Sequence, residues 1–188
     1  FFSDNGGPDT NNGSINAPHN GRKGILLEGG IRVPFVISYP KKLKSGFYNK
    51  PITALDLTPT FVELAGGKIT EKDKLDGVNI FPYITNQIEG VPHETMMWRF
   101  TISAGIRKGN WKLIRLPDRM PLLFNLDKDP SEQNNIAREN RDLVESMLKE
   151  LGDWDVSSPH ILFLEGSRWR RNQLNLYDKE YQLEQPKN

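Results

Sequence analysis

Apolar and polar positions follow different patterns in the two halves of the chain. In the first half, Phe1-Phe2 and the apolar run within 31–39 are typical of strands buried on both faces of a parallel sheet. Residues 8–24 between them are rich in Gly, Asn and Pro, which predicts a long irregular loop. Apolar residues at helical spacing within 53–65 then predict a helix that begins near Thr58.

Short β-like runs dominate the chain after residue 94, and Lys108-Gly109-Asn110 forms a tight turn between two of them. The expected strands are 95–100, 103–107, 111–116 and 122–126. Residues 138–151 then carry apolar side chains on one side of a predicted amphipathic helix. These patterns predict an antiparallel meander with one covering helix.

The change of pattern divides the chain into two predicted parts. Residues 1–90 are expected to be the incomplete C-terminal portion of an α/β domain, the end of a doubly wound sheet. Residues 91–188 are expected to form an α+β subdomain with a four-stranded antiparallel sheet, a packed helix and a tail. Two parallel strands have no independent stability, so we expect the chain to be a fragment or to pair with a missing part.

Composition excludes several classes of function. The chain has 188 residues, no Cys and a formal net charge of +1. The absence of Cys excludes a disulfide framework, a thiolate metal site and a Cys nucleophile. The near-neutral charge gives no global field for nucleic acid or an anionic membrane, and no apolar run approaches the roughly 20 residues of a membrane helix. We therefore expect neither nucleic acid nor a membrane as a partner.

Asp4-Asn5 directly follows the first apolar segment and is the first candidate site. In open α/β sheets ligands bind just outside the carboxyl ends of strands. The Asp4 carboxylate and the Asn5 amide carbonyl are hard oxygen ligands that suit Ca²⁺ or Mg²⁺. Asp, Asn and Gly are also common turn formers that need no metal, so spacing alone leaves both interpretations open.

Lys23 and His19 are candidates within the predicted loop. A Lys ammonium on a loop can hold an oxyanion as a point charge, although a solvated surface Lys has the same pattern. His19, four residues earlier, could donate to an anion or carry a proton near neutral pH, or be an ordinary loop His.

Other charged positions are interpreted as structural. Glu28 and Arg32 are spaced as a charge-assisted pair at a strand entrance, and Asp56 lies where a helix dipole favours a carboxylate. Aromatic and basic residues alternate along the antiparallel strands and are interpreted as a half-exposed sheet face, with the wall of a substrate cleft as the alternative. These residues are Trp98, Arg99, Arg107, Trp111 and Lys112.

Several short motifs occur in a fixed order. They are S-D-N-G-G at 3–7, N-A-P-H-N-G-R-K-G at 16–24, E-G-G-I-R-V-P-F at 28–35, D-L-T-P-T at 56–60, D-G at 76–77, R-K-G-N-W-K-L-I at 107–114 and L-F-N-L-D-K-D-P-S-E-Q-N-N at 123–135. Over about residues 1–150 this order resembles the carboxyl-terminal part of the type I sulfatases, the formylglycine-dependent members of the alkaline-phosphatase-like superfamily.

The resemblance implies a sulfuric ester hydrolase that acts on a sulfated small molecule or saccharide. Asp4 and Asn5 match the family's ligands to an active-site Ca²⁺, and Lys23 matches the Lys that contacts the sulfate group. The family makes its formylglycine nucleophile from a C/S-x-P-x-R motif, which is expected upstream and not in this chain. The 188-residue chain alone is therefore expected to be inactive, with the N-terminal part of the same protein as its partner. The family also implies a periplasmic or secreted location.

Departures from the family pattern lie beside the expected sulfate site. The family usually has Leu-Arg where this chain has His19-Asn20, and Gly where it has Arg22. His19 and Arg22 are therefore candidates for substrate choice, with a neutral replacement as the alternative. Two-metal phosphatases of the superfamily carry His where Asn5 stands, so Asn5 favours one hard cation. A phosphate or phosphonate ester hydrolase and a non-catalytic binding module remain the alternatives.

Overall fold

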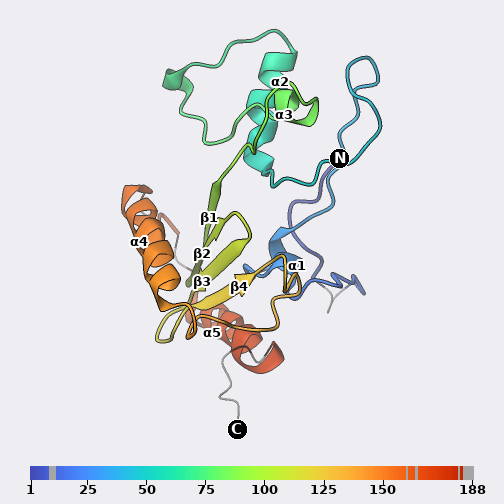
Figure 1. Ribbon diagram of the computed structural model, residues 1–188. Coiled ribbons are helices and arrows are strands. Elements are labelled where there is room, and N and C mark those ends of the chain that lie inside the picture. The colour runs from blue at the N-terminus through green and yellow to red at the C-terminus, as the bar shows by residue number, and fades with distance from the viewer. Residues whose placement is uncertain (9–11, 160, 164, 182, 184–188) are drawn as a thin grey trace. The chain divides into compact units, whose positions relative to one another are not determined.

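The computed structural model describes residues 1–8, 12–159, 161–163, 165–181 and 183. Residues 9–11 of the predicted loop lie outside the described residues. The chain separates into two compact units (Figure 1), the first made of residues 1–36 with the stretch from 95 onward and the second of residues 37–94. Residues 1–36 belong to the first unit because residues 25–27 pack into the core of the antiparallel sheet.

A four-stranded antiparallel sheet in the order β1-β2-β3-β4 forms the centre of the first unit. Its register places Met97 opposite Ile106, Ile106 opposite Leu113, and Leu113 opposite Leu123. The predicted meander is confirmed, including the turn at Gly109, whose φ of 57° suits a glycine. The strands are β1 (Thr95–Phe100), β2 (Ser103–Lys108), β3 (Trp111–Arg115) and β4 (Leu122–Asn125).

Both faces of this sheet are covered, because successive residues of a strand point to opposite faces. On one face Ile106, Leu113 and Leu123 pack against the long helix α4 (Arg141–Ser157). On the other face Ile114, Leu122 and Phe124 pack against residues 25–27 and against Tyr177. The second face therefore anchors the segment 16–30, named here the Lys23 loop, through its residues 25–27.

Helix α4 begins three residues later and ends six residues later than the predicted helix at 138–151. Its last turns carry few buried apolar residues, so the apolar pattern does not extend to them. Asp155 holds this end against the sheet through Arg99 of β1 at 3.0 Å and Arg115 of β3 at 2.6 Å. Burial alone would raise the pKa of Asp155, but the guanidinium groups of Arg115 and Arg99 outweigh it and lower that pKa.

The C-terminal tail, from residue 158 onward, contains α5 (Ser167–Asn175) and the π-helical turn η3 (Leu176–Glu180). In these two helices Gln173 and Tyr177, four residues apart, are fully buried. The tail has no apolar periodicity because a polar amide and a phenol occupy its inner side, and this is why the pattern did not predict its helices.

The two strands expected in the first half form only one antiparallel bridge, between Phe2 and Phe35. The short helix α1 (Glu28–Ile31) occupies the start of the expected strand 31–39, and Val36 is 61 % exposed. The expectation that this segment is buried on both faces is therefore wrong for the described residues. A strand becomes buried only when neighbouring strands and covering helices supply its contacts. Among the described residues this segment has only a single bridge, which does not bury it.

The second unit is a small helical region organised around Asp56. The Asp56 carboxylate accepts hydrogen bonds from the backbone N–H groups of Thr53 at 2.8 Å and Val78 at 2.9 Å, and it lies 2.8 Å from His93 Nε2. This confirms the structural interpretation of Asp56. The helices of this unit are η1 (Ala54–Asp56), α2 (Leu57–Leu64), η2 (Glu71–Asp73) and α3 (Phe81–Ile84).

Within the part of the chain that the structure describes, no helix is long and apolar enough to cross a membrane.

Candidate functional site

The segment that carries Asp4 and Asn5 lies against the Lys23 loop. The Lys23 backbone N–H donates to Gly7 O at 3.3 Å. The Asn16 side chain also accepts from Gly7 N and donates to Gly7 O, both at 2.9 Å. These bonds bring together the two candidate segments that sequence analysis identified separately.

The three candidate side chains are open to solvent or nearly so. Asp4 and Lys23 are exposed and Asn5 is half-buried. In the described residues no side-chain hydrogen bond or ion pair engages Asp4, Asn5 or Lys23; Ser3 Oγ donates to the backbone O of Asn5 at 2.9 Å instead. Two hard oxygen donors and one ammonium group are thus available to a ligand.

The donor set fits a hard cation in chemistry but supplies only part of a coordination shell. Ca²⁺ takes six to eight oxygen ligands. Among the described residues there is no group of three or more His, Cys, Asp or Glu side chains that could hold a metal ion. Asp4 and Asn5 could therefore hold such an ion only together with additional ligands that are not among these clustered side chains.

His19 is tied to the turn that follows β4. Its Nδ1 lies 2.9 Å from Pro130 O, and because a carbonyl only accepts, Nδ1 is the atom that donates. Ser131 Oγ donates to Pro18 O at 2.6 Å and strengthens the same contact. His19 also lines a surface hollow of about 290 Å³, formed by residues 14–21 and Tyr181. This hydrogen bond orients the imidazole ring through Nδ1 and does not use the other ring nitrogen, Nε2.

Arg22, a position where the sequence departs from the family pattern, is engaged with the C-terminal tail. Its Nη2 lies 2.8 Å from Glu180 Oε2. Its guanidinium is therefore part of the contact between the loop and the tail, although the sequence had made it a candidate for substrate choice.

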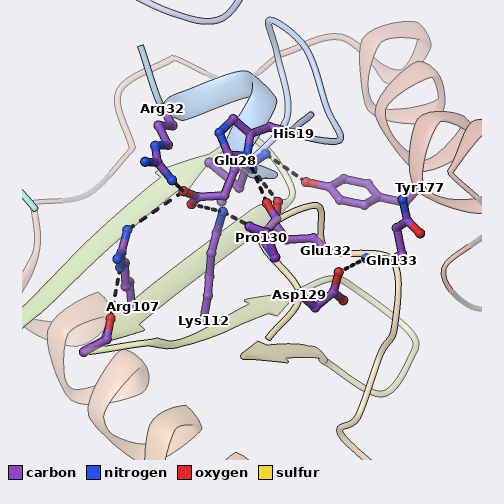
Figure 2. Close-up of polar contacts among 12 residues, drawn as sticks. His19, Glu28, Arg32, Arg107, Lys112, Asp129, Pro130, Glu132, Gln133 and Tyr177 are labelled. Carbon is purple, nitrogen blue, oxygen red and sulfur yellow. Dashed lines mark hydrogen bonds and ion pairs between the residues drawn. The ribbon is translucent and has the colours of Figure 1, made fainter. Parts of the chain in front are cut away.

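A buried ion cluster lies beneath the loop, made of Glu28, Lys112 and Glu132. The Lys112 ammonium is 2.8 Å from Glu28 Oε1 and 2.8 Å from Glu132 Oε1, and all three side chains are buried. Figure 2 shows Lys112 reaching up from the sheet between the two carboxylates. The interpretation of Lys112 as half-exposed is wrong, because two carboxylates from other segments compensate its charge and let it be buried.

The outer side of Glu28 faces two more cations. Arg32 Nη1 and Arg107 Nη1 each lie 3.9 Å from Glu28 Oε2. The predicted structural pairing of Glu28 with Arg32 is confirmed, although the Lys112 contact is much shorter. Figure 2 shows that Arg32, Arg107 and Lys112 approach the same carboxylate from different segments.

The two carboxylates of the cluster differ in pKa. Burial alone would raise the pKa of Glu28, but Lys112, Arg107 and Arg32 together outweigh burial and hold that pKa below its ordinary value. At Glu132 burial is the larger effect, and it raises the pKa although Lys112 opposes it. Glu28 is therefore the ionised partner of Lys112 at lower pH, and Glu132 takes up a proton more readily.

Glu132 is held in place by the turn 129–134. The Asp129 carboxylate accepts from the backbone N–H of Gln133 at 3.1 Å and of Asn134 at 2.8 Å. Glu132 itself has a φ of 54°, an uncommon conformation for a non-glycine residue, and its carboxylate accepts the Glu28 backbone N–H. The turn thus directs a carboxylate to the end of the loop.

The C-terminal tail holds the loop from the other side. Tyr177 Oη accepts the Leu26 N–H at 3.0 Å, and the Gln173 amide donates to Gly24 O. Thr101 Oγ1 in turn donates to Gln173 Oε1 at 2.6 Å. Gln173 and Tyr177 are not predictable from apolar periodicity, and their spacing of four residues is the one signal in the sequence that places them on the same helix face.

Comparison with known proteins assigns the family. Residues 22–156 match the family described as N-sulphoglucosamine sulphohydrolase, C-terminal. A sulfatase from Formosa agariphila is 30% identical over 185 residues, which cover 84% of this chain and 32% of that protein. Arylsulfatase H from Canis lupus familiaris is 27% identical over 191 residues, which cover 80% of this chain and 34% of that protein. The chain thus spans about a third of these relatives.

Solved structures agree with this assignment. Ps i-CgsB superposes with a TM-score of 0.78 and 31% identity over 96% of this chain and 42% of its own. PsFucS1 sulfatase from Pseudoalteromonas sp. has the same fold, with a TM-score of 0.68 and 20% identity over 83% of this chain and 36% of its own. The chain belongs to the sulfatase family, in which it corresponds to the carboxyl-terminal part.

Proposed function

We propose that the protein hydrolyses sulfate esters of a carbohydrate and that this chain supplies part of its active site. The observation that carries the proposal is the backbone contact that places the Lys23 loop beside the Asp4-Asn5 segment. It leaves one ammonium and two oxygen ligands, none of them engaged by another described side chain, on adjacent segments of a sulfatase family member.

Each of these residues has a proposed role. Lys23 binds a sulfate oxygen as a point charge and opposes the negative charge of the reacting group. Asp4 and Asn5 contribute oxygen ligands to one Ca²⁺ ion, which when bound would polarise the sulfate ester as a Lewis acid. The remaining ligands and the formylglycine nucleophile are expected from residues upstream in the sulfatase sequence.

A saccharide is the proposed substrate. Ps i-CgsB, which is 31% identical over 96% of this chain, has been solved in complex with k-i-k-neocarrahexaose. The hollow beside His19 and the exposed Lys23 would offer an oligosaccharide polar contacts and a positive charge.

The test uses the full-length protein with 4-methylumbelliferyl sulfate and with sulfated oligosaccharides. We expect Lys23→Ala to lower kcat/KM about 10²–10³-fold, the loss typical of one transition-state donor. The exposed Lys128 allows a matched control, Lys128→Ala, which should leave the rate unchanged. The 188-residue chain by itself is expected to show no turnover.

Metal analysis tests the proposed ligands separately from activity. The purified full-length protein should contain one calcium per chain, and Asp4→Ala and Asn5→Ala should each reduce that content. A content of two transition-metal ions, or hydrolysis of phosphate esters without sulfate esters, would contradict the proposal.

A further inference from the structure

An aromatic side chain of the C-terminal tail lies directly beside the residue that follows Lys23. The Trp169 ring atoms Cζ2 and Cη2 are 3.7 Å and 4.0 Å from the position that a Cβ on Gly24 would occupy. Trp169 nevertheless remains 44% exposed. Nearly half of this residue is therefore open to solvent, next to the proposed sulfate-binding Lys.

Helix α5, which carries Trp169, is strongly basic. Arg168, Arg170 and Arg171 are all exposed. In the described part of the chain none of the three guanidinium groups has an ion pair or a side-chain hydrogen bond, whereas Arg22, Arg99, Arg115 and Arg119 all pair with carboxylates. Three unneutralised guanidinium groups on one short helix attract an anionic ligand.

Helical spacing separates these arginines. Gln173 and Tyr177 mark the buried side of the tail. Arg170 precedes them by three and seven residues, so it lies on the same side as they do, at the edge of the contact with the Lys23 loop. Arg168 and Arg171 fall on the opposite side of α5. Arg170 is thus the arginine on the side of the helix that faces the Lys23 loop.

Trp169 is not one of the fully buried residues that hold the tail to the loop. Its helix is held to the loop by the Gln173 and Tyr177 hydrogen bonds, and these two residues are the buried ones. An aromatic ring and a guanidinium group that both lie near the Lys23 loop suit a sulfated sugar, because the ring packs against the apolar face of the sugar and the guanidinium binds a sulfate by two parallel hydrogen bonds.

We propose that Trp169 and Arg170 form a saccharide-binding subsite next to Lys23. Trp169 packs against the sugar ring adjacent to the one whose sulfate Lys23 holds, and Arg170 binds a further sulfate of the same oligosaccharide. The subsite rests on the proposed function of Lys23 and gives it a substrate class, an oligosaccharide with more than one sulfate.

The first test compares substrates of different size in the full-length protein. We expect Trp169→Ala to raise KM for k-i-k-neocarrahexaose about tenfold, as the loss of one stacking contact would. Its kcat/KM for 4-methylumbelliferyl sulfate, which is too short to reach the subsite, should stay within twofold. Trp169→Phe keeps a ring and should restore most of the affinity. Equal losses on both substrates would show a structural role and overturn the proposal.

The second test compares two arginines of the same helix. Arg170→Ala and Arg171→Ala remove the same charge from exposed positions of α5, so both variants should fold. We expect Arg170→Ala to weaken binding of the oligosaccharide several-fold and Arg171→Ala to leave it near wild type. Equal effects would indicate general electrostatic attraction and overturn the assignment of Arg170.

Direct binding keeps the subsite separable from catalysis. Dissociation constants for k-i-k-neocarrahexaose, dextran sulfate and uncharged dextran can be measured by calorimetry, with thermal melting to check the fold of each variant. If wild type binds the sulfated probes through Trp169 but hydrolyses no sulfate ester, the proposed function fails and the subsite stands. If wild type binds neither sulfated probe, or if Trp169→Ala binds as wild type does, the subsite is overturned.

Discussion

The Lys23 loop has an outer end and an inner end that differ in almost every physical respect. At the outer end Lys23 and the neighbouring Asp4 are exposed, and their side chains have no partners among the described residues. At the inner end residues 25–30 are buried, and Glu28 is part of the buried ion cluster. The difference suggests a division of labour in which the inner end fixes the backbone and the outer end stays free for a ligand.

Close backbone packing makes the inner end rigid. A Cβ on Gly30 would lie 2.1 Å from Ile25 O and 2.6 Å from Arg22 O, and one on Gly6 would lie 1.8 Å from Gly29 O. Backbone atoms cannot move aside as a flexible side chain can. The contact therefore needs glycine at these positions. Through it the buried inner end fixes the position of the backbone near Lys23 and near Asp4.

The largest expected effect is the loss of the buried cation at the inner end. Lys112→Met leaves Glu28 and Glu132 buried without their common partner, which should cost about 3–5 kcal/mol of unfolding free energy. Urea titration measures the loss. The triple variant with Glu28→Gln and Glu132→Gln removes the uncompensated charges and should regain part of it. A loss below about 1 kcal/mol for Lys112→Met would contradict the inferred importance of the cluster.

Steric overpacking at the inner end should give the next effect. Gly30→Ala forces its methyl group against two carbonyl oxygens and should cost about 1–3 kcal/mol. Gly152→Ala is the matched control, because a Cβ there meets nothing within 4 Å and lies in α4. The control should stabilise the protein by about 0.5–1 kcal/mol. Equal thermal stability of the two variants would argue against a rigid inner end.

The two carboxylates of the cluster should respond oppositely to pH. Glu28 has a lowered pKa, so its contribution to stability is present above its ordinary pKa and is lost as pH falls through the folded value. Glu132 has a raised pKa, so its contribution is present below its ordinary pKa and is lost as pH rises through the folded value.

This opposition can be read from two single variants. Relative to wild type, Glu28→Gln should become more destabilising as pH rises from 4 to 7, and Glu132→Gln should become less destabilising over the same range. Unfolding free energies measured at several pH values check both trends. Parallel trends in the two variants would contradict the unequal pKa shifts.

The smallest expected effect lies at the outer end. Lys23→Ala and Asn5→Ala remove side chains without partners in the described residues, so each should change the unfolding free energy by no more than about 0.5 kcal/mol. The same variants should have large effects on activity. A loss of stability comparable to that of Gly30→Ala would remove the distinction between the two ends.

The antiparallel sheet was predictable because its strands are short, carry β-forming side chains and are separated by clear turns. The burial of Lys112 was not predictable, because a charged residue in an alternating strand pattern is expected to be exposed unless its buried carboxylate partners are known. Those carboxylates come from Glu28 and Glu132, in segments outside the sheet. The tail was missed because Gln173 and Tyr177 replace an apolar stripe.

The candidate site could be predicted only in part. The order of the motifs identified Asp4, Asn5 and Lys23, and the structure brings their segments together through Gly7. Their catalytic and metal-binding roles stay predictions. The contacts of His19 with Pro130 and of Arg22 with Glu180 could not be foreseen, because each joins residues separated by more than a hundred positions.

The hydrogen bond from Leu26 to Tyr177 has a consequence for biosynthesis. The two residues are separated by 151 positions in the sequence. A chain still growing on the ribosome therefore exposes the Lys23 loop, with the Leu26 N–H unpaired, until the tail has emerged and folded back. The segment proposed to bind sulfate is made well before Tyr177, yet it reaches its final conformation only after translation has passed Tyr177.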